Sequence, residues 1–215
     1  MNRYQAVLFD LDGTLLDTLD DLADAVNHTL AAHQYPRRTR EEICCFVGNG
    51  IRDLITRALP QGTDTPHFEE ILADFRTYYA ANSQNKTAPY PGVIALLTAL
   101  RDAGVRVGVV SNKFDAAVRA LCREYFGDLV EIAVGERPGI AKKPAPDAVL
   151  DAMRLLDAPV DGCVLVGDSE TDVATAANAG IPCISVLWGF RDRACLLAAG
   201  ATTFAEDTDA LAALL

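Results

Sequence analysis

Several oxygen-bearing side chains follow directly after short apolar segments of the sequence. Asp10, Ser111 and Asp168 each end such a segment, and Asp12 and Asp172 lie two and four residues beyond the first and the last of them. Carboxylates that share one cleft repel one another, so either a cation lies among them or some of their pKa values rise. Oxygen ligands favour a hard cation, and Mg²⁺ is the usual one beside phosphate groups. The sequence therefore predicts a divalent-cation site wherever the fold brings these residues together.

The apolar segments have the composition and length of buried strands. They are rich in Val and Ile and alternate with helix-length segments, a pattern typical of a parallel sheet covered by helices on both faces. The segments are Gln5–Phe9, Val105–Val110, Val130–Val134, Cys163–Val166 and Ile181–Leu187. We therefore expect an α/β fold with a Rossmann-like parallel sheet of about five strands or more. Ligands bind beyond the carboxyl ends of such strands, which lie ~4.8 Å apart, so Asp10, Ser111 and Asp168 are expected in one pocket.

The stretch from residue 17 to residue 85 has a helical pattern throughout. Apolar residues recur there at helical spacing in three segments, and Thr39 and Glu42 have the spacing of a capping box at the start of a further helix. No strand pattern interrupts the stretch. We expect four helices inserted between the first and second strands. The chain then consists of a core domain, residues 1–16 and 86–215, and a helical cap domain, residues 17–85.

Composition and charge exclude several classes of protein. The 215 residues carry a formal net charge of −11 and no basic run of more than two residues, which argues against a nucleic-acid or anionic-membrane partner. No segment is long and apolar enough to span a membrane, and the first residues do not resemble a signal peptide. Six scattered cysteines without a C-x-x-C pair predict a reducing compartment, so we expect a cytoplasmic protein. With only three histidines, all in helix-patterned polar contexts, we do not expect histidine-based catalysis.

Four motifs, in chain order, resemble those of the haloacid dehalogenase superfamily of phosphohydrolases. They are Asp10–Leu15 (DLDGTL), Ser111, Lys143–Asp147 (KPAPD) and Gly167–Asp172 (GDSETD). Each motif alone is a weak signal, whereas all of them in this order, at predicted strand ends and helix starts, are specific. The resemblance runs from residue 6 to about residue 190 and so covers most of the chain.

The resemblance implies a covalent phosphoryl-transfer mechanism. Asp10 would attack phosphorus to give an aspartyl-phosphate, and Asp12 would protonate the leaving alcohol and later accept a proton from water. Lys143 and the Ser111 hydroxyl would offset the charge on the phosphoryl oxygens. Ser111 stands where Thr is commoner in the superfamily, a change that keeps the hydroxyl.

The same resemblance implies a Mg²⁺ cofactor. The ion would be held by the Asp10 carboxylate, the backbone carbonyl of Asp12 and Asp168, and Asp172 would bind it directly or through an ordered water. A second interpretation of Asp172 is an ordinary first-turn acid favoured by the helix dipole. A second interpretation of Ser111 is a cap for the following helix.

The helical insert stands where the superfamily has a cap that closes over the site and excludes water. Residues 46–59 (FVGNGIRDLITRAL) resemble the cap segment of phosphoglycolate phosphatases, as do the segments Ser111–Lys113 and Leu187–Phe190. The resemblance implies a small phosphorylated substrate, 2-phosphoglycolate first among them, and a monomer or homodimer. The residues expected to contact the substrate are Thr14, Gly48, Asn49, Gly50, Arg52, Asn112 and Lys113. The glycines could equally form a helix–helix turn, and Arg52 and Lys113 could equally be solvated.

Other activities of the superfamily stay open as alternatives. A pyrophosphatase or a β-phosphoglucomutase-like phosphomutase would share the core chemistry. A carbon–halogen hydrolase lacks the second aspartate of the first motif, so Asp12 argues against it. A phosphonate hydrolase needs a Schiff-base lysine in the cap, where the sequence offers only Lys86 at the edge. The remaining alternative is a non-catalytic binding protein on the same scaffold, against which the intact motif residues argue.

Overall fold

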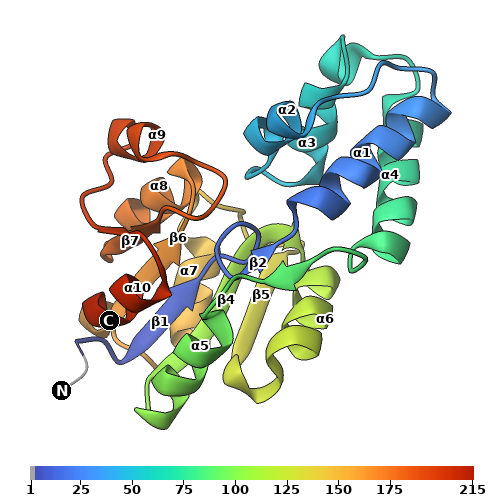
Figure 1. The fold of residues 1–215 in the computed structure, drawn as a ribbon. Helices are drawn as coiled ribbons and strands as arrows, with labels where there is room; N and C mark the ends of the chain where they lie inside the picture. The colour runs from blue at the N-terminus through green and yellow to red at the C-terminus, as the bar shows by residue number, and fades with distance from the viewer. Residues whose placement is uncertain (1–2) are drawn as a thin grey trace. The chain divides into compact units, whose positions relative to one another are not determined.

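The structure, a computed structural model, describes residues 3–215 and divides the chain into two compact units (Figure 1). One unit contains the residues up to Leu16 together with Pro89–Leu215, and the other is Asp17–Ala88. The chain passes between the units within β2 (Leu16–Asp17) and β3 (Ala88–Pro89), which form a two-stranded sheet. The sequence places the second boundary three residues earlier, after residue 85.

The larger unit contains a six-stranded sheet in which all neighbouring strands are parallel. The strand order is β5-β4-β1-β6-β7-β8. The strands are β1 (Ala6–Phe9), β4 (Arg106–Phe114), β5 (Ile132–Glu136), β6 (Cys163–Gly167), β7 (Cys183–Val186) and β8 (Phe204–Ala205). β1 lies at the centre because β4 and β6 pair with it on opposite sides. The predicted α/β fold is confirmed, and the short edge strand β8 adds a strand to the five predicted segments.

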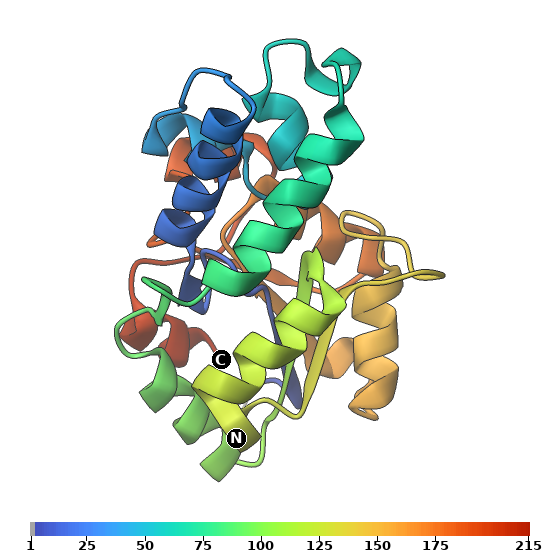
Figure 2. The ribbon, with the colours of Figure 1, turned by 90° about the vertical axis from the view of Figure 1, so that its right-hand side faces the viewer.

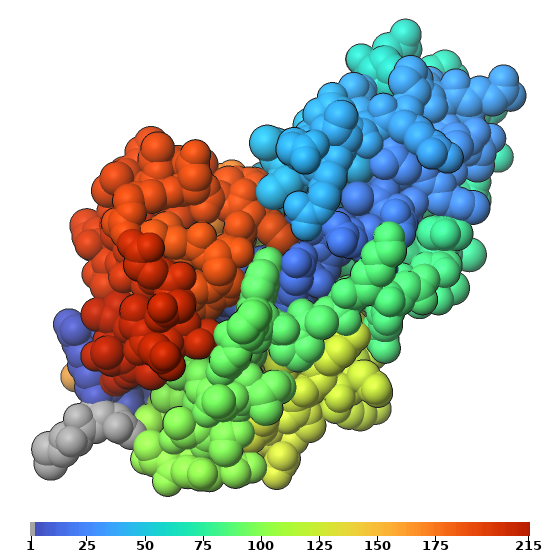
Figure 3. Space-filling model, in the orientation of Figure 1, coloured from blue at the N-terminus to red at the C-terminus, as the bar shows by residue number. Residues whose placement is uncertain are grey.

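Helices cover both faces of this sheet. On one face, side chains of α5, α6 and α10 pack against Val7 and Phe9 of β1, and on the other, α7 and α8 pack against Ala6 and Leu8. Figure 2 shows α6 and α7 on opposite sides of β5, and Figure 3 shows the red residues of α10 beside the green residues of α5. The helices of this unit are α5 (Val93–Asp102), α6 (Asp115–Phe126), α7 (Asp147–Leu155), α8 (Glu170–Ala179), α9 (Arg193–Ala198) and α10 (Thr208–Leu214), with 3₁₀ turns η2 (Gly127–Leu129) and η3 (Val160–Gly162). No helix in the described part of the chain is long and apolar enough to cross a membrane.

The burial of β1 explains its uniformly apolar sequence. All four of its side chains are fully buried, two under each helix layer. Each buried Leu or Phe contributes about 1.5–3 kcal/mol of transfer free energy. The strand is thereby fixed in the middle of the sheet, and the first residue after it emerges at the carboxyl edge.

Strand β4 runs further than the sequence predicts. The expected strand ends at Val110, whereas β4 continues to Phe114, and its pairing with β5 shifts register between these two residues. Gly135 of β5 lies against the shifted segment, where a Cβ atom would come within 2.5 Å of the carbonyl oxygen of Lys113. Such irregularities re-aim side chains at the end of a strand. The shifted segment includes residues 111–113, which carry three of the predicted site residues.

The smaller unit contains four α-helices, the number that the sequence predicts. They are α1 (Leu19–Ala32), α2 (Arg40–Phe46), α3 (Ile51–Ala58) and α4 (Phe68–Asn82), with a 3₁₀ turn, η1, at Gly62–Asp64. The predicted capping box is confirmed: Thr39 Oγ1 accepts a hydrogen bond from the Glu42 amide at 3.2 Å, and Glu42 Oε2 accepts one from the Thr39 amide at 2.7 Å. Helices α1 and α4 pack together through their apolar stripes.

A buried carboxylate joins α1 to the segment that precedes β3. Asp21 is 2% exposed, and its oxygens accept hydrogen bonds from the amides of Lys86 and Thr87 at 2.9–3.1 Å and from the Thr87 hydroxyl at 2.8 Å. The two ends of the smaller unit are therefore tied to each other within that unit. No local sequence pattern identifies Asp21, because its partners lie more than sixty residues away.

Candidate active site

Three aspartates meet at the carboxyl edge of the large sheet. Asp10 directly follows β1, Asp168 directly follows the neighbouring strand β6, and Asp172 lies in the first turn of α8. All three are buried, and one carboxylate oxygen of each lies within 4.8 Å of the others. Adjacent parallel strands therefore place in one cluster residues that are far apart in the sequence.

Lys143 lies between two of these carboxylates. Its ammonium nitrogen donates a hydrogen bond to Oδ1 of Asp172 at 2.6 Å and lies 2.9 Å from Oδ1 of Asp10. The contact with Asp10 is an ion pair outside hydrogen-bonding geometry, so among residues 3–215 this oxygen has no aligned donor. The loop that carries Lys143 is tied to β4 by Asn112, whose side-chain amide donates to the Lys143 carbonyl at 2.9 Å. Asn112, expected as a substrate contact, thus supports the lysine.

Burial and mutual repulsion disfavour the ionised forms of Asp10 and Asp168. Burial raises the pKa of Asp10 to about 6, with Lys143 opposing the rise and Asp172 adding to it. Burial, and after it the charges of Asp10 and Asp172, raises the pKa of Asp168 to about 8. Burial acts against the charge of Lys143, but Asp10 and Asp172 outweigh it and raise the pKa of this ammonium above its usual range. The cluster therefore holds one firmly charged lysine, and Asp10 and Asp168 are fully ionised at neutral pH only if further positive charge lies among them.

Asp168 is held in place from two sides. Thr14 Oγ1 donates to its Oδ1 at 3.1 Å, and the Phe190 amide donates to its Oδ2 at 2.7 Å. Gly13 leaves room for this arrangement, because it has a φ of +88° and a Cβ there would lie 2.3 Å from Oδ2 of Asp168. The Trp188 indole donates to the Thr14 carbonyl at 3.0 Å and so fixes the same turn. Thr14, expected to contact substrate, supports Asp168, and the backbone amide of Phe190 is a contact that sequence reasoning missed.

Asp172 is fully buried, and both of its oxygens have partners. Oδ1 accepts from Lys143, and Oδ2 accepts from the amide and the hydroxyl of Ser169 at 3.1 and 2.6 Å. Ser169 and Asp172 form the capping box of α8. Both interpretations of Asp172 therefore describe the structure, since it is a first-turn helix acid and a member of the cluster. Ser169 was missed, although its S-x-x-D spacing could have identified it.

A second ion pair lies beside this cluster. Lys113 Nζ donates to both oxygens of Asp12, at 2.8 and 3.0 Å. The Lys113 side chain is 4% exposed and that of Asp12 13%, so the lysine is the more deeply buried partner. Ser111 Oγ accepts a hydrogen bond from the Lys113 amide at 3.3 Å. The interpretation of Ser111 as a helix cap is wrong, because α6 begins after Phe114.

The other four predicted substrate contacts lie in the helical unit. Gly48, Asn49 and Gly50 connect α2 to α3, and the two glycines have φ values of +128° and +84°, which other residues rarely adopt. Arg52 on α3 donates hydrogen bonds to the two carboxylate oxygens of Glu69 at 3.1 and 2.5 Å. Both side chains are at least half exposed, and water screens the attraction within an ion pair of that kind, so it adds little stability. A carboxylate on a ligand could therefore replace Glu69 at small cost.

The residues at the carboxyl edge of the sheet fit a divalent cation. When all four carboxylates described above are ionised, they carry four negative charges, and the two lysines that contact them neutralise two. Oδ1 of Asp10 has no aligned donor among the described residues, and carboxylate oxygens are the ligands that Mg²⁺ prefers. A divalent cation would neutralise the remaining charge and stabilise the ionised forms of Asp10 and Asp168.

Known proteins similar in sequence match nearly the whole chain. A family model described as haloacid dehalogenase-like hydrolase matches residues 7–186. A phosphoglycolate phosphatase of Mesorhizobium japonicum is 36% identical over 192 residues, which cover 87% of this chain and 84% of that protein. A plasmid phosphoglycolate phosphatase of Cupriavidus necator is 36% identical over 213 residues, 98% of this chain and 92% of that protein.

Solved structures match the fold of both units. A crystal structure from Lactobacillus delbrueckii subsp. bulgaricus, whose assignment as a phosphoglycolate phosphatase is itself a prediction, superposes with a TM-score of 0.94. It is 35% identical and the match covers 99% of this chain and 98% of that one. CbbY of Rhodobacter sphaeroides, solved with xylulose-(1,5)bisphosphate, gives a TM-score of 0.74 at 26% identity, with 95% of each chain covered. In sequence and in fold, the chain is thus similar to proteins named as phosphoglycolate phosphatases and to one that was solved with a sugar bisphosphate.

Proposed function

The chain belongs to the haloacid dehalogenase-like hydrolases and is a phosphatase, and from this premise we propose that it hydrolyses small phosphomonoesters with Mg²⁺, 2-phosphoglycolate first among them. The observation that carries the proposal is the buried cluster of Asp10, Asp168 and Asp172 around Lys143. A nucleophilic carboxylate beside a fixed ammonium, at the edge where parallel sheets bind ligands, is suited to phosphoryl transfer.

Asp10 is the proposed nucleophile. One of its carboxylate oxygens forms a bond to phosphorus while the bond from phosphorus to the substrate oxygen breaks, which leaves an aspartyl-phosphate and an alcohol. Asp12, two residues on, gives the alcohol its proton. In the second step a water oxygen attacks phosphorus, Asp12 takes the proton of that water, and the Asp10 carboxylate leaves. Phosphate is released and both aspartates return to their starting forms.

Lys143 and Ser111 are proposed to bind the phosphoryl oxygens. The Lys143 ammonium stays charged and is held by Asp172, so it can face the developing charge without reorganisation. Asp172, whose two oxygens already have partners, serves this arrangement by fixing the lysine. Asn112 does the same from the backbone side through the Lys143 carbonyl.

Mg²⁺ would be held by Asp10, Asp168 and the backbone carbonyl of Asp12, with Asp172 behind them. When bound, the ion supplies positive charge that polarises the phosphoryl group and offsets repulsion between its oxygens and the carboxylates. Thr14 and the Phe190 amide orient Asp168 for this role. Asp10 and Asp168 then remain ionised at neutral pH in spite of their burial.

The preference for 2-phosphoglycolate is proposed from the relatives and from the helical unit. Curated relatives 34–36% identical over most of their length are phosphoglycolate phosphatases. The substrate carries a carboxylate, and Arg52 offers a guanidinium whose present partner, Glu69, is solvent-exposed. We propose that the turn at residues 48–50 and Arg52 recognise this end of the substrate.

A panel of phosphate esters tests the proposal. Phosphate release with Mg²⁺ is measured for 2-phosphoglycolate, pyrophosphate, hexose phosphates, nucleoside monophosphates and a pentulose bisphosphate, each as kcat/KM. We expect 2-phosphoglycolate to lead by about tenfold or more, equivalent to about 1.4 kcal/mol of transition-state discrimination. Asp10→Asn is expected to fold and to abolish turnover, and activity near that of the wild type in this variant would remove Asp10 as nucleophile.

A sugar bisphosphate is the second candidate substrate, because the CbbY neighbour was solved with xylulose-(1,5)bisphosphate. A ranking led by the pentulose bisphosphate would support it. A phosphomutase would instead form an isomeric sugar phosphate without net release of phosphate. The cytoplasmic location and the monomeric or dimeric state expected from the sequence stay predictions.

A further inference from the structure

Lys113 and Asp12 form a largely buried ion pair between two segments that are distant in the sequence. The lysine donates to both carboxylate oxygens, at 2.8 and 3.0 Å, and joins residues that are 101 positions apart in the sequence. Desolvation offsets most of the attraction in a buried ion pair, so such a pair adds little net stability. An apolar pair at these positions would hold the two segments together as well. The pairing therefore calls for a reason other than stability.

The depth of the two side chains suggests what that reason is. Lys113 is the deeper partner and Asp12 the more exposed one, 4% against 13%, so the ammonium supports the carboxylate from the protein side. The pair of Lys143 and Asp10 has the same order, 2% against 12%. Each carboxylate of the first motif is thus backed by its own buried lysine.

The contact with both oxygens fixes the plane of the carboxylate. A single hydrogen bond leaves a carboxylate free to turn about its Cβ–Cγ bond, whereas two donors from one ammonium restrict that rotation. The backbone at Lys113 is itself fixed, because Ser111 Oγ accepts from the Lys113 amide and Gly135 packs directly against the Lys113 carbonyl. The register shift in β4 therefore aims this lysine at Asp12.

Cys122 on α6 is buried, and burial, with a smaller contribution from the Asp12 charge, raises its pKa to about 12. The thiol is therefore neutral at physiological pH and offers Lys113 no opposite charge. Asp12 is an anionic partner of this ammonium, which it contacts through both carboxylate oxygens.

We propose that Lys113 is a positioning residue that holds the Asp12 carboxylate in the orientation required for proton transfer to the leaving group. This inference rests on the proposed function, in which Asp12 is the general acid and base. It differs from the role expected from the resemblance, in which Lys113 contacts the substrate. The two roles lead to different measurable effects.

Substrates with different leaving groups distinguish a positioning role of Lys113 from a direct contact with the substrate. Only phosphoenzyme formation involves the leaving group, and kcat/KM reports that step. An alkyl phosphate such as ethyl phosphate needs protonation of its leaving oxygen, whereas 2,4-dinitrophenyl phosphate does not. If Lys113 acts through Asp12, we expect Lys113→Met to lower kcat/KM about 30-fold for ethyl phosphate and less than about threefold for 2,4-dinitrophenyl phosphate, as a partial loss of general-acid catalysis.

A double-mutant cycle tests the same point independently. Phenyl phosphate, of intermediate reactivity, allows the residual activity of Asp12→Asn to be measured. In that background Lys113→Met should lower kcat/KM by less than about twofold, because the Asp12 carboxylate through which Lys113 acts is already absent. Lys113→Arg, which keeps the charge, should recover part of the wild-type rate. It also provides a second variant if Lys113→Met folds poorly in thermal melts.

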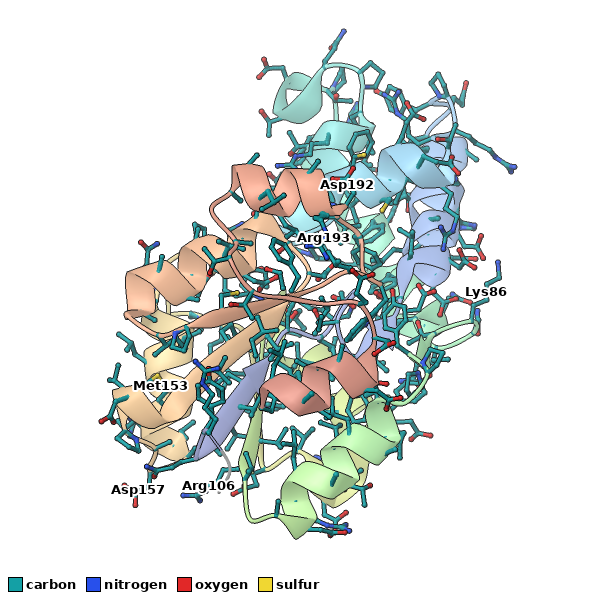
Figure 4. The ribbon with its side chains drawn as sticks, turned by 60° about the vertical axis from the view of Figure 1, so that its left-hand side comes forward. Lys86, Arg106, Met153, Asp157, Asp192 and Arg193 are labelled. Carbon is teal, nitrogen blue, oxygen red and sulfur yellow. The ribbon has the colours of Figure 1, made fainter. Side chains whose placement is uncertain are left out.

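Lys86→Met is the matched control. Lys86 lies in the helical unit, its ammonium pairs with Asp24 at 2.7 Å, and both side chains are more than half exposed. Figure 4 shows its side chain extending outward from the segment after α4. We expect this variant to keep wild-type kcat/KM for every ester in the set.

Three results would overturn the proposal. Equal losses for the alkyl and the dinitrophenyl ester would show that Lys113 acts on the phosphoryl group. A loss confined to 2-phosphoglycolate, with ethyl phosphate unchanged, would make Lys113 a contact for the substrate carboxylate. If Lys113→Met lowered kcat/KM as much in the Asp12→Asn background as in the wild type, Lys113 would not act through Asp12. Failure of the underlying mechanism is recognised separately, because Asp12→Asn alone would then retain wild-type activity towards ethyl phosphate.

Discussion

Lys143 and Asp172 form an ion pair in which both side chains are buried, with 2.6 Å between Nζ and Oδ1. The pair joins the loop before α7 to the first turn of α8, and the same ammonium lies 2.9 Å from Asp10. Asp172 is therefore compensated by a lysine and by the cap of α8. Asp168 accepts two hydrogen bonds but pairs with no lysine among residues 3–215, and burial raises its pKa to about 8.

This difference predicts that two isosteric substitutions affect the free energy of unfolding of the metal-free protein differently. Asp172→Asn removes the main partner of a buried ammonium and should cost about 3 kcal/mol in the free energy of unfolding. Asp168→Asn removes a carboxylate whose charge burial disfavours and should leave the stability at pH 8 unchanged or raised. Urea unfolding in EDTA measures both, and losses of equal size would contradict the assigned charge balance. Both variants should lose phosphatase activity.

The raised pKa values also predict how Mg²⁺ and pH act together. The folded protein holds protons on Asp10 and Asp168, with pKa values of about 6 and about 8, that the unfolded chain releases near 3.8. Their contribution to the stability of the metal-free protein therefore falls as the pH rises from about 4 to 8. Because Mg²⁺ competes with these protons, it should raise Tm more at pH 8 than at pH 6. Melting curves with Mg²⁺ or EDTA check this, and an equal Mg²⁺ effect in Asp168→Asn would exclude Asp168 as a ligand.

Chelation should stop turnover reversibly. EDTA is expected to abolish phosphate release, and excess Mg²⁺ to restore it, because the carboxylate cluster repels a phosphate ester when its charge is not neutralised. Ca²⁺, which prefers longer bonds and more ligands, should restore less activity than Mg²⁺. Activity that is indifferent to EDTA would remove the metal from the mechanism.

Asp21 is predicted to stabilise the helical unit. Its carboxylate accepts hydrogen bonds from two backbone amides and a hydroxyl, so Asp21→Ala leaves buried donors unsatisfied and should cost about 3 kcal/mol. Asp24→Ala on the same helix removes only an exposed pair with Lys86, whose attraction water screens, and should leave the free energy of unfolding nearly unchanged. Urea unfolding and protease sensitivity of the segment 86–88 measure the difference. Similar stabilities of the two variants would show that the Asp21 contacts do not hold the unit together.

The cysteines should differ sharply in reactivity. Burial raises the pKa values of the Cys122 and Cys183 thiols to about 12, so they are protonated at pH 8. Cys45 is exposed on α2. Iodoacetamide at pH 8 should therefore modify Cys45 within minutes and leave Cys122 and Cys183 unmodified until the protein is denatured. Peptide mass spectrometry checks this, and rapid modification of Cys122 in the native protein would contradict the packing of α6 against the sheet.

Local patterns in the sequence were enough to predict much of the fold. The apolar segments identified five strands because a strand buried on both faces must be apolar throughout, as β1 is. The box formed by Thr39 and Glu42 was predicted because its partners lie three residues apart. The ends of β1 and β6 placed Asp10 and Asp168 together, since neighbouring parallel strands end at one edge.

The tertiary structure alone decided which partners these residues have. The resemblance predicts that Lys113 contacts the substrate, and the register shift in β4 gives it Asp12 as a partner. The resemblance predicts Thr14 and Asn112 beside the ligand, and the structure shows in addition that they support Asp168 and the Lys143 loop. These contacts join segments 31 to 154 residues apart. A sequence pattern shows the period with which side chains face the core, and this period is a local property of the chain. The pairing of buried polar groups depends instead on distances between remote segments, and only the packing of the whole chain sets those distances.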